Sequence, residues 1–158
     1  MRSKIQRLKD LKQIVGILKK QGKKIVFTNG CFDLLHIGHV RYLQEAKSLG
    51  DILIVAINSD ESVRKIKGKG RPITPADERA EILAALECVD YVTIFHETLP
   101  NRLIEDLKPD IHVKGGDYSI NELPEAKIVK SYGGKVVITN KVKNRSTTKI
   151  IEYIKKTF

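Results

Sequence analysis

The stretch that most constrains this chain runs from Ile25 to His39, where an apolar segment, a glycine-containing loop and the start of a helix follow one another. This order predicts a strand-loop-helix unit. Such a unit directs backbone N–H groups and the positive end of a helix dipole at one point, which suits a phosphate group. His36 and His39 are three residues apart, so at helical spacing they project from the same side, and Gly38 leaves room for a ligand. The pattern predicts a phosphate site with two imidazoles.

Length and composition limit the number of domains and the kinds of partner that this chain can have. A chain of 158 residues predicts one domain, 1–158, with its own core. The net charge of +10 favours anionic partners, but the lysines are scattered, so a solvated surface explains the charge equally well. Cys31 and Cys88 lack C-x-x-C spacing, which predicts a reduced, cytoplasmic setting. No window approaches the roughly 18 apolar residues of a spanning helix, so we expect no membrane association.

The rest of the chain alternates between helical and strand patterns. Ser3 followed by Gln6 resembles a capping box, and apolar residues at helical spacing as far as Gly22 predict a lead-in helix within 1–22. Strands are predicted at 25–27, 52–57, 91–95, 111–114 and 136–139, with helices between them and a terminal helix within 146–158. This alternation with short loops predicts an α/β fold built on a doubly wound, five-stranded parallel sheet.

Two basic segments are candidates for phosphate binding. The loop 67–72 places Lys67, Lys69 and Arg71 among glycines, which favours a mobile phosphate-binding loop, although a plain surface loop has the same composition. Arg79 lies in the first turns of the next helix. It could reach a phosphate from there or pair with a neighbouring glutamate, and the sequence leaves the two readings open.

The last two strands lead into two further candidate loops. Gly115 and Gly116 allow a tight turn that brings Asp117 to the sheet edge, where its carboxylate could accept from a base amino group or a sugar hydroxyl, or could simply close the turn. Arg145 and the hydroxyl residues 146–148 open the terminal helix, where they could cap the helix or bind a phosphate. Ligands of open parallel sheets bind beyond the carboxyl ends of the strands, so we expect these groups at one edge.

Two common phosphate motifs are absent from the sequence. It contains neither G-x-G-x-x-G nor G-x-x-x-x-G-K-[ST], so neither the dinucleotide fingerprint nor the Walker loop accounts for the phosphate features. A kinase or dehydrogenase of the usual kinds would show one of them. The two imidazoles stand where a Walker loop would place a lysine.

The motif residues resemble a known superfamily. Gly30-Cys31-Phe32-Asp33 followed by His36-Ile37-Gly38-His39 resembles the G-x-F-D-x-x-H-x-G-H signature of nucleotidyltransferases such as cytidylyltransferases, phosphopantetheine adenylyltransferase and class I aminoacyl-tRNA synthetases. The segments 67–72, 114–118 and 146–151 are similar to the adenylyltransferase domain of bifunctional heptose-phosphate kinase/adenylyltransferases, over nearly the entire chain. Asn144-Arg145 departs from that pattern towards the cytidylyltransferases. The resemblance implies a single domain with a Rossmann-like nucleotidyltransferase fold.

The resemblance also implies a reaction and its partners. AMP would pass from ATP to D-glycero-β-D-manno-heptose 1-phosphate with release of pyrophosphate, and Mg²⁺ would be held mainly through the ATP phosphates. A homodimer is usual among relatives. The lack of a kinase domain implies a separately encoded heptose-phosphate kinase.

By the same resemblance, the catalytic residues are His36, His39 and Lys67. The implied nucleotide-binding residues are Cys31, Phe32, His36, Gly38, His39, Lys114, Gly115, Asp117, Ser146, Thr147 and Thr148. The implied residues on the sugar-phosphate side are Thr28, Asn29, Asp33, Arg79 and Arg145.

Three alternatives stay open at this level. Relatives on the same fold serve other acceptors, as in glycerol 3-phosphate cytidylyltransferase or FMN adenylyltransferase, and a fold does not fix a substrate. Cys31, Asp33, His36 and His39 also have ligand chemistry for zinc, which would suit a non-enzymatic metal-binding module. Nucleic-acid binding would need aromatic residues among the basic ones; these are sparse, and we expect no nucleic-acid partner.

Overall fold

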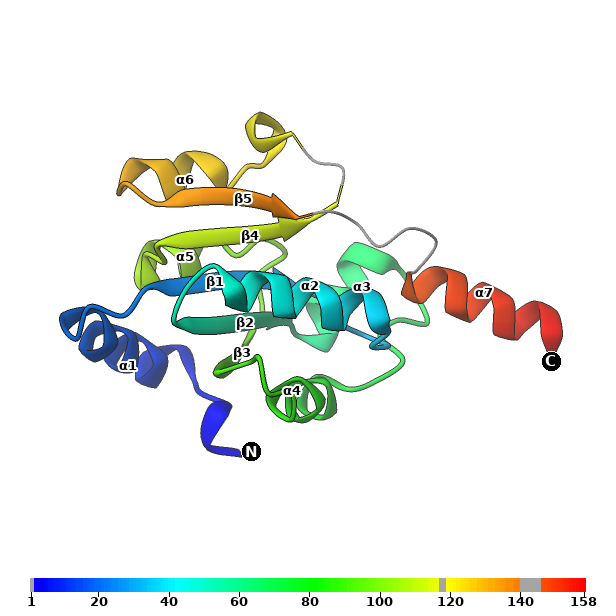
Figure 1. The fold of residues 1–158 in the computed structure, drawn as a ribbon. Coiled ribbons are helices and arrows are strands. Elements are labelled where there is room, and N and C mark those ends of the chain that lie inside the picture. The colour runs from blue at the N-terminus through cyan, green and yellow to red at the C-terminus, as the bar shows by residue number, and fades with distance from the viewer. Residues whose placement is uncertain (1, 117–118, 140–145) are drawn as a thin grey trace.

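The centre of the molecule is a parallel sheet. The computed structural model describes residues 2–116, 119–139 and 146–158. Five strands pair in parallel in the order β3-β2-β1-β4-β5, which Figure 1 shows from bottom to top. Their bounds are β1 Ile25–Gly30, β2 Ile52–Asn58, β3 Tyr91–Phe95, β4 Ile111–Gly115 and β5 Lys135–Thr139. The predicted five-stranded parallel sheet is confirmed.

Helices connect the strands and cover the sheet. Their bounds are α1 Leu8–Lys20, α2 Ile37–Ser48, α3 Asp60–Lys67, α4 Ala76–Ala84, α5 Asn101–Leu107, α6 Ala126–Ser131 and α7 Thr147–Thr157, with short 3₁₀ turns at Arg2–Lys4 and Ile120–Glu122. The terminal helix α7 projects away from the sheet in Figure 1 and contains no buried residue. No helix among the described residues is long and apolar enough to cross a membrane.

The two faces of the sheet carry separate cores, as the period of two in a strand requires. In β1, Val26 packs with residues of α2 and α4, among them Leu43 and Leu83. Its neighbours Ile25 and Phe27 pack with residues of α1, α5 and α6 on the other face. Helices therefore cover both faces, which confirms the doubly wound arrangement.

The strand order locates the ligand-binding edge. From β1 the chain builds outward to β2 and β3, and then returns to place β4 and β5 on the other side of β1. The order therefore reverses between β1 and β4, and open α/β sheets bind ligands beyond the strand ends at such a point. β1 ends at Gly30 and β4 at Gly115, so both predicted glycine loops open at this edge.

The lead-in helix is shorter than predicted within 1–22. It begins at Leu8, with Arg7 at the N-cap. Ser3 and Gln6 form no helix cap; instead Gln6 Nε2 donates to the Ser3 carbonyl at 2.6 Å. Ile5 pairs in parallel with Val92 at the edge of β3, and the chain stays extended from there to Arg7 at the N-cap. The sheet edge therefore overrides the local capping pattern.

Candidate active site

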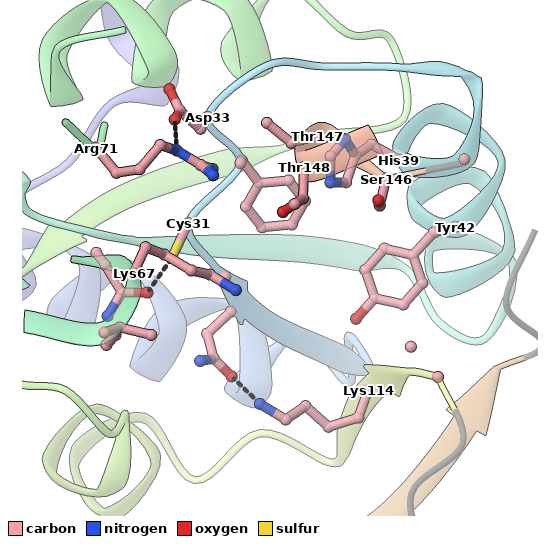
Figure 2. Close-up of a pocket in the computed structure, with 18 of the residues that line it drawn as sticks. Cys31, Asp33, His39, Tyr42, Lys67, Arg71, Lys114, Ser146, Thr147 and Thr148 are labelled. Carbon is pink, nitrogen blue, oxygen red and sulfur yellow. Dashed lines mark hydrogen bonds and ion pairs between the residues drawn. The ribbon is translucent and has the colours of Figure 1, made fainter. Parts of the chain in front are cut away.

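A pocket of about 590 Å³ opens at the carboxyl ends of β1 and β4. Most of the predicted site residues line it: Asn29, Cys31, Phe32, Asp33, His36, Gly38, His39, Lys67, Lys114, Gly115, Ser146, Thr147 and Thr148. Figure 2 shows Lys67, Arg71 and Lys114 facing one cavity, with His39 and the start of α7 on another wall. Segments more than 100 residues apart in sequence therefore form one site.

The two histidines lie ring against ring where α2 begins. His36 is the N-cap, and its Nδ1 accepts from the Gly38 N–H at 3.1 Å, so the neutral ring carries its proton on Nε2. The rings of His36 and His39 stack with centroids 3.9 Å apart. Burial, and then the neighbouring His36, lower the pKa of His39 to about 4. At neutral pH, His39 is therefore a neutral imidazole.

Phe32 holds this arrangement from the side of β1. Its φ of 46° lies in the left-handed region, which is strained for a residue with a side chain. Its ring lies 5.3 Å from that of His39 and covers Gly30, where an added Cβ would come within 3.0 Å of Phe32 Cε2. The glycine of the motif is needed because the phenyl ring occupies the space a side chain would take.

Asp33 lines the pocket but turns its carboxylate to the loop before α4. It accepts from Arg71 Nε at 2.6 Å and from the backbone N–H groups of Ile73 and Thr74, both at 2.9 Å. Burial alone would raise the pKa of Asp33, but these donors lower it. The side chain is 1% exposed, so it anchors the loop and orients Arg71, whose guanidinium extends towards the pocket (Figure 2). The predicted place of Asp33 on the sugar-phosphate side stays a prediction, and in this structure the carboxylate contacts the pocket wall through Arg71.

Two residues predicted on the sugar-phosphate side do not line the pocket. Arg79 is buried away from the pocket, because its guanidinium donates to the carbonyls of Thr74 and Cys31 and to Asp60 Oδ1 at 2.5 to 2.8 Å. Thr28 is fully buried in β1, where its hydroxyl pairs with Tyr42 Oη. Arg79 and Thr28 therefore hydrogen-bond to residues that line the pocket, Cys31 and Tyr42, but do not line it themselves.

Tyr42 is a pocket residue that was not predicted from the sequence. Its hydroxyl donates to the Val113 carbonyl at 3.0 Å, and burial raises its pKa. Its ring lies against β4, where a Cβ added to Gly115 would come within 3.1 Å of Tyr42 Cε2. Tyr42 thus ties α2 to β1 and β4 and sets the close approach at the strand ends. Its spacing of three from His39 already placed it on the histidine face of α2.

The other lining residues that were not predicted are Asn58, Ile66, Thr98 and Leu99. Gly30, Arg71 and Gly116 also line the pocket and stand in loops that the sequence singled out. Asn58 directly follows the apolar run of β2, so its place at the strand end was a usable signal. Its Oδ1 lies 3.9 Å from Cys31 Sγ. Burial raises the pKa of the Cys31 thiol, so it is protonated at neutral pH. Ile66, Thr98 and Leu99 carry no sequence signal of their own.

Lys67 and Lys114 bring two ammonium groups to the pocket from opposite sides of β1. Lys67 is exposed at the end of α3. Lys114 is held in place: its Nζ lies 3.3 Å from Asn29 Oδ1 and 3.0 Å from Glu125 Oε1. With Arg71, they make the pocket wall cationic.

The start of α7 closes another wall. Ser146 is its N-cap and accepts from the Lys149 N–H at 3.2 Å, and Thr147 donates to the Leu34 carbonyl at 3.0 Å. The backbone N–H groups of the first turn therefore lie at the pocket, where a helix N-terminus favours an anion. Asp117 and Arg145, the two remaining predicted residues, lie outside the described residues.

The zinc alternative finds no support in this geometry. Asp33, one of its four candidate ligands, is committed to Arg71 and to backbone donors. Within residues 2–116, 119–139 and 146–158, no group of three or more His, Cys, Asp or Glu side chains could hold a metal ion.

Comparison with known proteins places this site in a family. A family model described as cytidylyltransferase-like matches residues 27–153, which include both the histidine motif and the start of α7. The chain belongs to the cytidylyltransferase-like family. By this membership it is a nucleotidyltransferase domain, and the predicted superfamily is confirmed.

Similar curated proteins of this family are longer. The bifunctional protein HldE of Geobacter sulfurreducens is 52% identical over 156 residues, 99% of this chain and 32% of that protein. The bifunctional protein HldE of Geobacter metallireducens is 57% identical over 152 residues, 96% of this chain and 31% of that protein. The chain thus spans about a third of the length of these relatives.

Solved structures share the family's fold. A lipopolysaccharide core biosynthesis protein from Thermoplasma volcanium matches with a TM-score of 0.63 and 33% identity, over 78% of this chain and 100% of that chain. A pantoate-beta-alanine ligase from Francisella tularensis matches with a TM-score of 0.60 and 19% identity, over 91% of this chain and 68% of that chain. The second likeness shows the fold alone.

Proposed function

We propose that this chain is an adenylyltransferase that transfers AMP from ATP to the phosphate of D-glycero-β-D-manno-heptose 1-phosphate and releases pyrophosphate. The observation that carries the proposal is the identity of 52% and 57% with bifunctional proteins named HldE across nearly the whole chain. It agrees with the resemblance of the site motifs to the adenylyltransferase domain of heptose-phosphate kinase/adenylyltransferases. The structural likeness to the lipopolysaccharide core biosynthesis protein of T. volcanium supports a role in the same kind of biosynthesis.

The reaction needs charge stabilisation more than proton transfer. The attacking phosphate oxygen and the leaving pyrophosphate are both anionic at neutral pH, so no general base is required. The catalyst must hold the two groups in line and neutralise the charge that gathers around the α-phosphate. A pocket lined by cations, imidazoles and a helix N-terminus, with its nearest carboxylate turned away, suits this task.

Each wall of the pocket has a role in this proposal. His36 and His39 donate N–H groups to the ATP phosphates and stabilise charge on the α-phosphate in the transition state. The first turn of α7, with Ser146 to Thr148, holds the triphosphate. Lys67 and Lys114 neutralise phosphate oxygens, and Arg71, oriented by Asp33, adds a third cation. The backbone of Cys31 and Phe32 binds the nucleotide.

Mg²⁺ is part of the proposal. Because the described residues offer no cluster of metal ligands, and Asp33 is already paired, the ion would be held chiefly by ATP phosphate oxygens. When bound there, it supplies charge neutralisation on the phosphates. The protein then binds the metal and the nucleotide as one unit.

The remaining partner assignments stay predictions. Asp117 at the ribose or base, and Asn29 and Arg145 on the sugar-phosphate side, belong to this group. So do the homodimer and the cytoplasmic setting.

A pyrophosphate-release panel tests the proposal. Purified protein with Mg²⁺ is assayed with ATP or CTP against heptose 1-phosphate, glycerol 3-phosphate, pantetheine phosphate, FMN and nicotinamide mononucleotide. We expect the highest kcat/KM for ATP with heptose 1-phosphate. A higher kcat/KM for CTP with glycerol 3-phosphate, or for ATP with FMN, would contradict the proposal and identify that reaction as the function instead.

A further inference from the structure

A buried carboxylate lies directly behind the cationic wall of the pocket. Glu125 precedes α6, and its side chain is 2% exposed. Its Oε1 lies 3.0 Å from Lys114 Nζ and 3.3 Å from Nε2 of His112, which is fully buried. Glu125 does not line the pocket, whereas Lys114 does. Glu125 therefore reaches the site only through the lysine.

The charges of this cluster are well defined. Burial alone would raise the pKa of Glu125, but the His112 hydrogen bond and the Lys114 ammonium lower it to about 2. Burial lowers the pKa of His112, so its ring is neutral and its Nε2–H donates to the carboxylate. At neutral pH the cluster is thus one carboxylate that pairs with one ammonium. A buried carboxylate without that partner would be strongly unfavourable.

Two oxygens from separate elements hold the Lys114 ammonium. Asn29 Oδ1, near the end of β1, lies 3.3 Å away, a contact drawn as the dashed line at Lys114 in Figure 2. Glu125 Oε1 holds it from the other side at 3.0 Å. A lysine side chain is flexible, with three N–H donors. Two of these N–H groups point at oxygens that are fixed in place. The third N–H group then points in one defined direction, in which it can donate to a phosphate oxygen.

We propose that Glu125 is a positioning residue for nucleotidyl transfer: with Asn29, its carboxylate fixes the Lys114 ammonium at the pocket wall, where the ammonium meets a substrate phosphate. The inference rests on the proposed function, because it concerns a lysine of that same site. It assigns a role in turnover to a residue outside the pocket.

A double-mutant cycle in steady-state pyrophosphate release tests the proposal. The proteins are wild type, Glu125→Gln, Lys114→Met and the double variant, with Glu105→Gln, an exposed acid on α5, as the charge-matched control. A group misplaced by about 1 Å loses on the order of 10²-fold in rate, so we expect Glu125→Gln to lower kcat/KM roughly 10-fold to 100-fold. The control should stay at the wild-type rate.

The double variant separates positioning from mere structural support. If Glu125 acts through Lys114, the double variant is no slower than Lys114→Met alone. Fully additive losses would overturn the proposal, and so would a Glu125→Gln variant as fast as wild type. If Glu125→Gln does not fold, Glu125→Asp replaces it in the cycle; that variant keeps the charge but retracts it by one methylene, and a wild-type rate for it would overturn the proposal.

The wild-type rate tests the proposed function separately. If wild type is inactive with heptose 1-phosphate, the same cycle is measured in the Kd for Mg-ATP by calorimetry. Glu125→Gln is then expected to weaken ATP binding in wild type and not in Lys114→Met. An unchanged Kd would overturn the role of Glu125.

Discussion

At the scale of single residues, His39 is the most informative side chain. Its ring is half-buried between His36 and Phe32, and its pKa of about 4 keeps it neutral at pH 7. A bound triphosphate would favour the charged ring and raise this pKa.

The low pKa of His39 predicts how stability depends on pH. The unfolded chain takes up the His39 proton near pH 6.5, but the folded chain does so only near pH 4. The free energy of unfolding therefore falls as the pH is lowered between these values, because the unfolded state binds more protons there. Urea unfolding at pH 7 and pH 4.5 should show a smaller loss for His39→Gln than for wild type. Equal losses would contradict the neutral assignment.

Residue roles were harder to predict than residue positions. Arg71 and Arg79 were predicted in adjoining basic segments, but only Arg71 lines the pocket. The difference arises from partners that spacing cannot reveal: Asp33 orients the first guanidinium, while Asp60 and two carbonyls bury the second. Motif residues locate a site, but long-range hydrogen bonds decide which of them face a ligand.

At the scale of elements, α7 is the least anchored part of the site. It buries no side chain, yet its first turn lines the pocket. The Thr147 hydroxyl connects this turn to the Leu34 carbonyl at 3.0 Å, in the loop between β1 and α2. That hydrogen bond joins the pocket wall formed by the loop after β1 to the wall formed by the start of α7.

Thr147→Val should therefore weaken nucleotide binding more than it lowers stability. Loss of one hydrogen bond of about 1 kcal/mol corresponds to about a fivefold higher Kd for ATP, measured by calorimetry. Thr157→Val is the matched control, because that hydroxyl donates to the Tyr153 carbonyl at 2.8 Å at the far end of the same helix. If both variants bind ATP as wild type does, α7 is not held to the pocket in this way.

The order and type of the elements followed from periodicity and turn residues. The strand at 91–95 was predicted at the residues observed. The hydroxyl residues 146–148 were predicted to open the terminal helix, and Ser146 is its N-cap. The start of α1 was not, because Ile5 pairs with Val92 on a strand more than 80 residues later. Local sequence patterns predict the bounds of an element well where no strand distant in sequence pairs with its residues.

At the scale of the whole molecule, the fold concentrates cations where the strand order reverses. Lys67, Arg71 and Lys114 reach one pocket from both sides of β1, although the net charge of +10 is spread along the sequence. Composition alone therefore could not locate the anion site. The reversal between β1 and β4 does so, because it brings together loops distant in sequence.

The makeup of this pocket also predicts how the protein responds to chelation. EDTA should stop pyrophosphate release, because in the proposed reaction Mg²⁺ enters with ATP, and added Mg²⁺ should restore the rate. The melting temperature without ATP should not change, since the described residues hold no metal-ligand cluster. A lower melting temperature in EDTA, restored by zinc, would instead support the metal-binding alternative.

Label transfer tests the central claim most directly. ATP labelled with ³²P at the α-phosphate is incubated with Mg²⁺, heptose 1-phosphate and either wild type or His39→Ala. The products are then separated, and their masses are determined by mass spectrometry. We predict that wild type moves the label into ADP-heptose, one for each pyrophosphate released, and that folded His39→Ala does not. Label that stays out of any sugar nucleotide with wild type, or transfer by His39→Ala at the wild-type rate, would contradict the proposed reaction.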